Sequence, residues 1–141
     1  MLLDNPERNI DLNARDYLGK TALILACENG HKDVVQLLLD NPERNIDLNA
    51  KTVDGWTAFI YACMNRHKDV VKLLLDISER NIDLNAKSNR HGWTAFIHAC
   101  RRGQKELVKL LVQSSKTKGI DISTGQDYIP DEMRLFIDSL Q

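Results

Sequence analysis

The sequence has no apolar run long enough to cross a membrane. Its apolar stretches, such as Val34 to Leu39, which Gln36 interrupts, are short, whereas a membrane-spanning helix needs about 20 apolar residues. The N-terminus also has no charged region followed by a long apolar core, so no secretion signal is indicated. With 43% hydrophobic and 28% charged residues, the 141-residue chain has the composition of one ordinary soluble domain. We therefore expect an intracellular protein, cytoplasmic or nuclear.

Cysteine is also scarce, because the chain contains only three. A disulfide framework in a small secreted protein uses an even number of cysteines at close spacing. The odd number therefore favours free thiols and a reducing compartment.

Net charge is small, at -1, but this near-neutrality is an average over unlike segments. Residues 1–50 hold 9 acidic and 5 basic side chains, whereas residues 87–118 hold 1 acidic and 8 basic ones. Residues 119–141 are acidic again, with 5 acidic side chains and 1 basic. The basic segment predicts an acidic partner or an acidic neighbour within the chain.

The chain is built from repeats. Residues 4–14 read DNPERNIDLNA, residues 40–50 read the same eleven letters, and residues 76–86 read DISERNIDLNA. In the same register each unit carries an Ala-Cys pair, and the three cysteines lie 36 and 37 residues apart. A period between about 20 and 50 residues is the signature of a repeat array. We therefore expect stacked units with a shared core.

Each unit begins with a turn that leads into a first helix. A glycine is followed two residues later by Thr21, Thr57 or Thr94, whose hydroxyl is placed to cap the helix. The helix is expected to run for two to three turns and to end near Gly30 in the first unit, since glycine adopts the left-handed cap without strain.

A second helix follows at His31 and is expected to stop before Pro42, because proline disfavours helix in the residue before it. Its apolar residues recur at helical spacing and predict a broad buried face. In the first unit this face comprises Val34, Val35, Leu37, Leu38 and Leu39. The unit is thus a helix, a turn, a second helix and a long loop.

At these positions the chain resembles the ankyrin-repeat family, whose units carry a T-P-L-H-x-A signature and a period of about 33 residues. The matching stretches are residues 21–27, 57–63 and 94–100, each followed by a Lys-Asp-Val-Val or Lys-Glu-Leu-Val segment. The resemblance implies an all-α ankyrin-repeat solenoid of stacked helix-turn-helix units with long connecting loops. It also implies that His31 and His67, which open second helices, fix the turn by hydrogen bonds.

Two departures from the family pattern are visible. Alanine replaces the family proline, and Ile24, Ile60 and Ile97 replace the family histidine, so apolar packing takes the place of a capping network. The loop after the second helix is about three residues longer than usual for the family. Such NIDLNAK-type units resemble those of giant-virus and protist ankyrin proteins.

The repeats divide the chain into five segments. We expect the end of a truncated preceding repeat at 1–13, repeats at 14–49, 50–85 and 86–118, and a loop with a C-terminal capping helix at 119–141. Residues 1–3 stand where the second helix of a preceding unit should finish, which suggests a piece of a longer array or a first unit with little cover.

The final helix is expected to open at residues 129–132, with proline and acids in its first turn. Residues 117–126 are predicted to form the connecting loop. One face of the helix should close the solenoid through Met133, Phe136, Ile137 and Leu140.

Catalytic and metal chemistry have little support. Cys27, Cys63 and Cys100 hold one small inward position, and neighbouring helices about 8–10 Å apart are too distant for disulfides. Zinc would require four close ligands. His91 and His98 each stand alone, and no triad or Gly-rich phosphate loop recurs. We predict neither an enzyme nor a bound cofactor.

What remains is the surface. In ankyrin proteins the turn tips and the exposed side of the first helices form a concave face that binds partners, and the matching positions can be carried over. These are Tyr17, Leu18, Lys20, Glu28 and Asn29 in the first unit, Val53, Asp54, Trp56, Met64 and Asn65 in the second, and Arg90, His91, Trp93, Arg101 and Arg102 in the third. Trp, Tyr, Met and Arg are enriched at protein interfaces.

Trp56 and Trp93 are equivalent by register, so stacking of the two indoles on each other is an alternative to a binding role, and the two roles are compatible. The basic third unit could receive an acidic patch or peptide of a partner protein. The acidic tail from Asp121 to Asp138 could instead fold back and neutralise it. Nucleic acid is a weaker partner, because the net charge is slightly negative and no strip of alternating aromatic and basic residues occurs.

The function predicted from the sequence is a non-catalytic protein-protein interaction module or adaptor. Two alternatives remain. One is a structural fragment that self-associates through an exposed N-terminal edge at Leu2 and Leu3, which would make the chain a weak oligomer in place of a monomer. The other is an engineered or excised segment of a larger ankyrin-repeat protein whose activity lies elsewhere.

Overall fold

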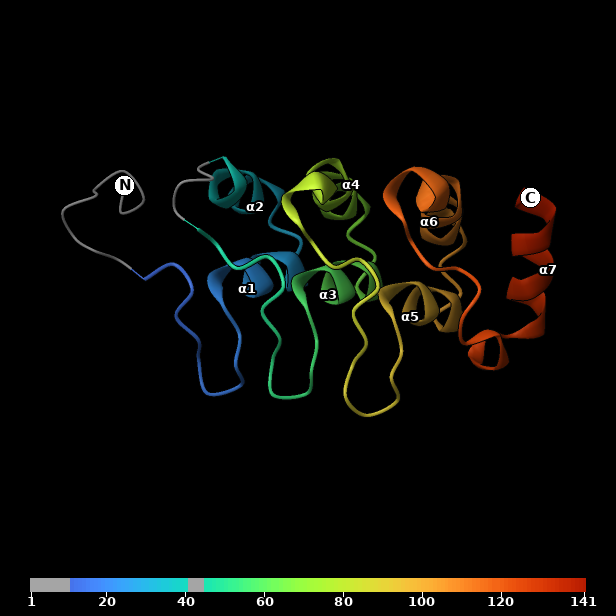
Figure 1. Ribbon diagram of the computed structural model, residues 1–141, viewed down its shortest axis with the longest axis horizontal. Helices are drawn as coiled ribbons and strands as arrows, with labels where there is room; N and C mark the ends of the chain where they lie inside the picture. Colours follow the sequence, from blue (N-terminus) through green and yellow to red (C-terminus); the bar gives the residue numbers. More distant parts are fainter. Residues whose placement is uncertain (1–10, 41–44) are drawn as a thin grey trace.

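A computed structural model describes residues 11–40 and 45–141 of the chain. Within these two ranges all regular structure is helical, which confirms the predicted all-α class. Figure 1 shows two rows of helices, with the first helix of each unit in one row and the second helix in the other. In chain order the elements are α1 (Ala22–Glu28), α2 (Lys32–Leu39), α3 (Ala58–Met64), α4 (Lys68–Asp76), η4 (Ser78–Arg80), α5 (Ala95–Arg101), α6 (Lys105–Lys118), η5 (Gln126–Tyr128) and α7 (Asp131–Leu140).

The first helices begin where the sequence predicts. The hydroxyl oxygens of Thr21, Thr57 and Thr94 accept hydrogen bonds from the backbone N–H groups three residues further on, at 3.2, 3.2 and 3.3 Å. Each threonine is nearly inaccessible to solvent, and its backbone is extended. Because helix N–H groups in the first turn lack intrahelical partners, this cap satisfies one of them in the interior.

The turn between the two helices of a unit requires a left-handed residue. Gly30 and Gly103 adopt φ values of 68° and 66°, whereas the second unit places Arg66 there with φ 65°. A side chain in this conformation costs about 1–2 kcal/mol. The second unit therefore holds backbone strain that the other two avoid.

Packing between units creates one continuous core. Helix α1 packs against α3, α3 against α5, and α2 against α4. Phe59 and Phe96 are the largest side chains that are almost fully buried. The isoleucines that replace the family histidine are also buried, at 1–2% exposure for Ile24, Ile60 and Ile97.

The predicted buried face of α2 is only partly correct. Val35, Leu38 and Leu39 are buried and Leu37 is half-buried, but Val34 is 45% exposed. The equivalent Val70 of α4 is 1% exposed, in a helix that packs against the second helix of the preceding unit. The described residues provide no such neighbour for Val34.

The long loops are tied to one another by asparagine side chains. Asn49 donates to the Asn81 carbonyl at 2.7 Å and accepts the Asp83 N–H at 2.6 Å. Asn13 and Asn85 make the same pair of bonds to the loop that follows each of them. The loops therefore form a second line of contact beside the helices.

The last helix packs against the end of the repeat array, beside α6 (Figure 1). Met133 and Ile137 are buried, and Phe136 and Leu140 pack partly buried against the core, as the helical spacing predicts. The loop expected at residues 117–126 is wrong at both ends. Helix α6 continues to Lys118 and stops at left-handed Gly119, and a short 3₁₀ turn begins at Gln126.

Several predictions concern residues 1–10 and 41–44, which lie outside the described residues. These concern Leu2 and Leu3, the truncated preceding repeat up to residue 10, and the stop of the second helix at Pro42. The segment boundaries remain predictions. No helix within residues 11–40 and 45–141 is long and apolar enough to span a membrane.

Candidate functional surface

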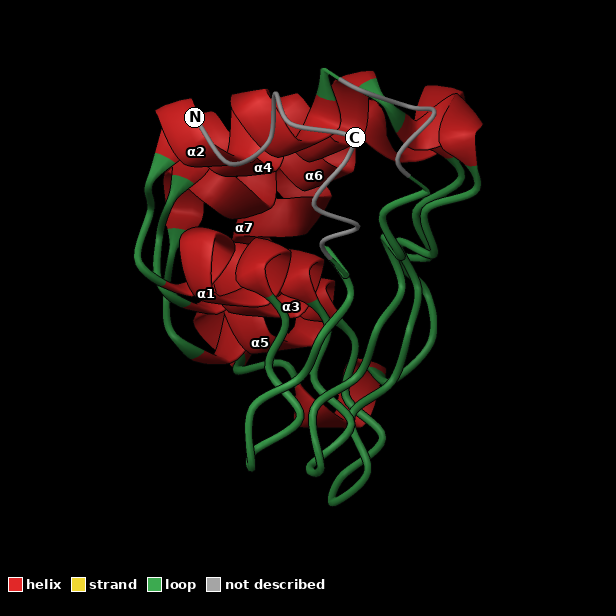
Figure 2. Cartoon of the chain, turned by 90° about the vertical axis from the view of Figure 1, so that its left-hand side faces the viewer, coloured by secondary structure: helices red, strands yellow, loops and turns green. Residues whose placement is uncertain are grey.

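The turn tips hang as a row of loops beside the first helices, and Figure 2 shows them projecting away from the helical body. The predicted binding positions lie on these tips and at the ends of α1, α3 and α5. We call this surface the tip face. The three units differ in how exposed these side chains are and in whether they already make ion pairs or hydrogen bonds within the chain.

In the first unit Tyr17 is 89% exposed at the tip and Leu18 is 38% exposed. Lys20 and Glu28 are occupied with each other, with 2.8 Å between Lys20 Nζ and Glu28 Oε2. This ion pair raises the pKa of Lys20, chiefly through its hydrogen bond to Glu28. The exposed Asn29 bonds its own helix, with 2.8 Å from its amide to the Leu25 carbonyl.

In the second unit Val53 and Asp54 are exposed and Trp56 is half-buried. Met64 is only 7% exposed, so it forms part of a wall and not a projecting contact. Asn65 donates to the Glu28 carbonyl of the preceding unit at 3.1 Å. The Asn65 amide therefore stabilises the contact between the second unit and the first.

The third unit carries the positive charge. Arg90, His91, Arg101 and Arg102 are exposed, and Trp93 is half-buried. Arg101 lies over the Trp93 ring at 4.2 Å and donates to the Tyr128 carbonyl at 2.9 Å. Arg101 is thus held in place, whereas no hydrogen bond or ion pair engages the guanidinium groups of Arg90 and Arg102 in the described part of the chain.

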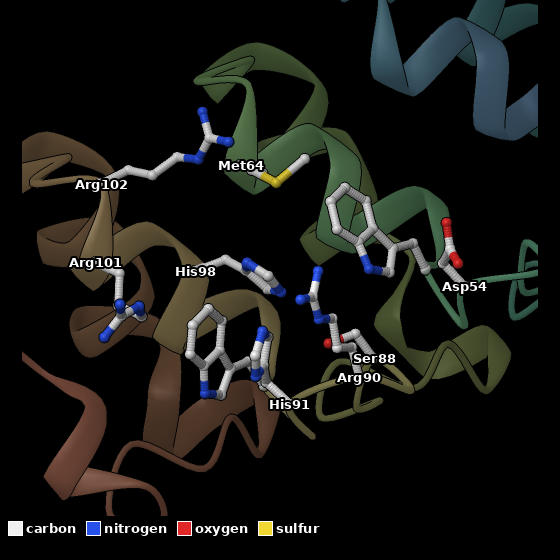
Figure 3. A pocket seen from close by; sticks show the side chains of 10 residues that line it. Asp54, Met64, Ser88, Arg90, His91, His98, Arg101 and Arg102 are labelled. Carbon is white, nitrogen blue, oxygen red and sulfur yellow. The ribbon is translucent and has the colours of Figure 1, made fainter.

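Between the second and third tips the tip face is hollowed into a cavity of about 460 Å³, which we call the tip cavity. Figure 3 shows side chains of both units converging on it. It is lined by aromatic, cationic and a few polar groups. The lining consists of Asp54, Trp56, Met64, Ser88, Arg90, His91, Trp93, His98, Arg101 and Arg102.

The indoles of Trp56 and Trp93 do not stack on each other, contrary to the alternative considered for them. The His98 ring lies between them, with its centroid 5.5 Å from each indole. His91 stacks on the outer side of Trp93 at 4.3 Å. Both histidines therefore contact aromatic rings of the turn tips.

His98 is the most unusual polar group of the tip cavity. It is 8% exposed, and its Nε2 atom has no hydrogen-bond partner. Burial, and after it the nearby positive charge of Arg102, together lower the pKa of His98 to about 4. The ring is therefore uncharged at neutral pH. The indole nitrogen of Trp93 is likewise buried without a partner.

The acidic tail does not neutralise the basic unit through ion pairs. The ion pair that the tail makes within the described residues joins Asp131 and Arg134, both in α7. Asp121 accepts hydrogen bonds from Ser123 and Thr124, which holds the pKa of its carboxyl well below its usual range. Lys105 lies over the Phe136 ring at 5.7 Å and Arg101 donates to the Tyr128 carbonyl, so the tail meets the basic unit through an aromatic ring and a backbone carbonyl.

Sequence reasoning missed His98, which lines the tip cavity, and Tyr61, which packs beside the lining residue Trp56. Tyr61 lies 5.0 Å from the Trp56 ring. One signal was available: the position before each Ala-Cys pair is Leu25, Tyr61 or His98, although the residues on either side are almost invariant among the units. Variation inside an otherwise constant repeat marks a position that the core does not dictate.

The cysteines lie away from the tip cavity and are buried as free thiols. Burial raises the pKa of Cys27 and of Cys100 to about 12, which suppresses the reactive thiolate at neutral pH. In the described ranges no three His, Cys, Asp or Glu side chains gather closely enough to hold a metal ion.

His67 carries out the role that the family resemblance implies. Its Nε2 atom lies 2.9 Å from the Glu28 carbonyl of the preceding unit. In the third unit Gln104 replaces it and donates to the Met64 carbonyl at 2.7 Å. His31 is exposed and has no described carbonyl opposite it.

These features define an all-α tandem-repeat solenoid, a class of scaffold that presents side chains along one face. A family model described as "Ankyrin repeats (3 copies)" matches residues 43–126, and one described as "Ankyrin repeats (many copies)" matches residues 7–62. Because the first match alone covers more than half of the 141 residues, the chain belongs to the ankyrin-repeat family. Ankyrin repeats typically bind other proteins and are typically non-catalytic.

A curated relative shares part of this sequence. The rice protein (Oryza sativa subsp. japonica) named "Probable E3 ubiquitin-protein ligase XBOS33" is 53% identical over 32 residues. The match covers 23% of this chain and 6% of the rice protein. It therefore spans about one repeat unit and leaves most of the rice protein without a counterpart.

Proposed function

We propose that this chain is a non-catalytic protein-binding module that captures its partner on the tip face, with Trp56, Trp93, Arg101 and Arg102 as anchors. One observation carries the proposal. The units are nearly identical in their core and loop positions, but they differ where side chains reach the tip face, and those differing side chains form the tip cavity. A scaffold kept constant beneath a varied surface is the arrangement expected of a binding protein.

The residue types support the same conclusion. Tryptophan and arginine dominate the energetics of protein interfaces, because they combine large contact area with directed polar contacts. Here two tryptophans and three arginines line one cavity. Burial raises the pKa values of the thiols of Cys27 and Cys100 and so suppresses their reactivity. Within the described residues, His98 Nε2 has no acid or nucleophile bonded to it. These groups therefore do not support a catalytic role.

The test is capture of binding proteins from a lysate by the immobilised chain and by matched variants. Trp93→Ala and Arg102→Glu are expected to abolish capture while the helical circular dichroism signal is retained. Lys109→Glu is the charge-matched control, because Lys109 is exposed on α6 and outside the tip cavity. If the wild type and both tip-face variants captured the same identified proteins in equal amounts, Trp93 and Arg102 would not be anchors for the partner.

A second candidate function is self-association, and a specific feature favours it. Leu25 and Val34 are 39% and 45% exposed, whereas the equivalent Tyr61 and Val70 are 9% and 1% exposed. Two exposed apolar side chains on one repeat form a surface against which the helices of a second copy can pack. Light scattering from 1 to 200 μM, taken as roughly the range in which weak interfaces respond, should then show concentration-dependent mass that Val34→Asp abolishes. A constant monomer mass would reject this candidate.

A further inference from the structure

The tip cavity combines three properties that together specify a ligand: aromatic walls, unpaired positive charge and unsatisfied buried nitrogen atoms. Trp56 and Trp93 supply the walls, and His98 lies between them. Arg90 and Arg102 supply the charge. The nitrogens are Nε2 of His98 and Nε1 of Trp93.

Buried polar atoms without partners are uncommon in folded proteins, because each has given up its hydrogen bonds to water. His98 is about nine-tenths buried, and Figure 3 shows its ring turned toward Arg90. Trp93 Nε1 can only donate, and the Nε2-protonated tautomer of neutral His98 also donates. Both nitrogens are therefore donors without an acceptor in residues that line the cavity.

The charge of the lining selects the kind of acceptor. Three arginines and one carboxylate, that of Asp54, line the cavity, so these four side chains together carry a net charge of 3 - 1 = +2. Arg101 is already engaged by the Trp93 ring and the Tyr128 carbonyl. Arg90 and Arg102 are exposed, and they make no ion pair with any acid in the described ranges. Guanidinium groups pair most strongly with carboxylates and phosphates, which they bind through two parallel hydrogen bonds.

We infer that the tip cavity receives an acidic side chain, Asp or Glu, from an extended segment of a partner protein. Its carboxylate pairs with Arg90 and Arg102, and neighbouring atoms of the segment pack against Trp56 and Trp93. This inference rests on the proposed function and names the chemistry of the partner. A carboxylate fits better than a simple apolar contact, because an apolar group would leave both arginines and both buried nitrogens without an acceptor.

Asp54 provides an internal check on this assignment. Its carboxylate lies on the same lining as the arginines and makes no ion pair in the described structure. It must repel an incoming carboxylate, since like charges in one site oppose each other. Asp54→Asn should therefore tighten acid binding, whereas it should weaken the binding of a basic side chain.

The experiment uses pools of capped seven-residue peptides that lack tryptophan and carry a fixed central residue: glutamate, glutamine, lysine or phosphoserine. The two tryptophans of the chain both line the cavity, so intrinsic fluorescence reports directly on its occupation. The glutamate pool should bind at least about tenfold more tightly than the glutamine pool, which corresponds to about 1.4 kcal/mol. This preference should shrink as salt rises from about 50 to 500 mM, because exposed charges are screened.

Variants of the lining test which residues produce the preference for glutamate over glutamine. The double change Arg90→Gln with Arg102→Gln should abolish the preference for glutamate, and Asp54→Asn should increase it severalfold. Lys109→Gln removes one positive charge outside the cavity and should leave the preference unchanged. Circular dichroism of each variant shows whether it is folded.

The outcomes separate this inference from the proposed function. Equal binding of the glutamate and glutamine pools, or binding of the phosphoserine pool alone, overturns the acidic side-chain assignment. If partner capture still depends on Trp93 in that case, the tip face binds proteins but by other chemistry. If capture also ignores Trp93, the proposed function falls with it.

Discussion

Asn49 and Asp83, 34 residues apart in sequence, are joined by a 2.6 Å hydrogen bond from the Asp83 backbone N–H to the Asn49 side-chain oxygen. The amide of Asn49 also donates to the Asn81 carbonyl at 2.7 Å. One side chain thus clips the loop at the end of the first unit to the loop at the end of the second. The same residue in the repeat makes the same pair of bonds in the units before and after, at Asn13 and Asn85.

Replacing Asn49 with alanine should lower the free energy of unfolding by about 1–2 kcal/mol, since two hydrogen bonds between units are lost and water satisfies the exposed loop atoms only in part. Chemical denaturation followed by circular dichroism measures this. Asn89→Ala is the control, because the Asn89 amide makes one long 3.3 Å bond to the Val53 carbonyl. Equal losses from the two variants would show that the asparagine clip does not stabilise the array.

The asparagine clip also shows what could not be predicted from the sequence. The eleven-residue block predicts the repeat period and a long loop, but the pairing of its Asn and Asp joins residues 34–36 positions apart. No local rule for turns or helices describes such a contact. Only the stacking of whole units brings these atoms together.

The helices were easier to predict, because caps and apolar periodicity are local signals. Thr21, Thr57 and Thr94 cap helices as expected. The tip face was predicted position by position from the family resemblance, and its binding role remains a prediction. What the sequence could not reveal was the interior of the site: His98 fills the space between two indoles only once the third unit is stacked on the second.

The strained turn of the second unit makes a prediction about stability. Arg66 has φ 65° where the other units have glycine. Arg66→Gly should raise the free energy of unfolding by about 0.5–1 kcal/mol, because relief of left-handed strain outweighs the extra freedom of glycine in the unfolded chain. Thermal and urea denaturation of the two proteins measure the change. A loss of stability would mean that the Arg66 side chain makes contacts worth more than the strain.

The two turn glycines differ in a way that offers a matched comparison. A side chain added at Gly103 would meet nothing within 4 Å, so Gly103→Ala should cost only the conformational strain, about 1 kcal/mol. A side chain added at Gly30 would collide with the His67 ring, which bonds the Glu28 carbonyl. Gly30→Ala should therefore cost at least about 1 kcal/mol more, since a hydrogen bond is also displaced. Equal losses in urea denaturation would contradict this.

His98 predicts a dependence of stability on pH. Its pKa is about 4 in the folded protein and about 6.5 when unfolded, so between these values the unfolded chain binds the additional proton. Stability should fall as pH decreases from about 6.5 to about 4, by about 1–3 kcal/mol in total, and this contribution should level off below pH 4. Loss of the Asp121 carboxylate interactions adds to the decline only at lower pH, because its folded pKa is depressed.

The measurement is urea denaturation at several pH values for wild type and His98→Leu. Leucine already occupies the equivalent position in the first unit, at Leu25. The variant should lack the component of the decline between pH 6.5 and 4 and retain the acid component below it. Parallel curves for the two proteins would mean that His98 is not the group that titrates.

The final helix provides the last prediction, because it presents a buried and an exposed apolar residue two positions apart. Ile137 is 5% exposed and belongs to the core, whereas Leu135 is 71% exposed. Ile137→Ala should reduce the free energy of unfolding by about 2–3 kcal/mol, since it leaves a cavity where α7 packs against α6. Leu135→Ala should change it by less than about 0.5 kcal/mol. If the two variants were equally stable, and deletion of residues 119–141 were also without effect, α7 would not act as the cap of this solenoid, because a cap must hide apolar surface that the last repeat cannot hide alone.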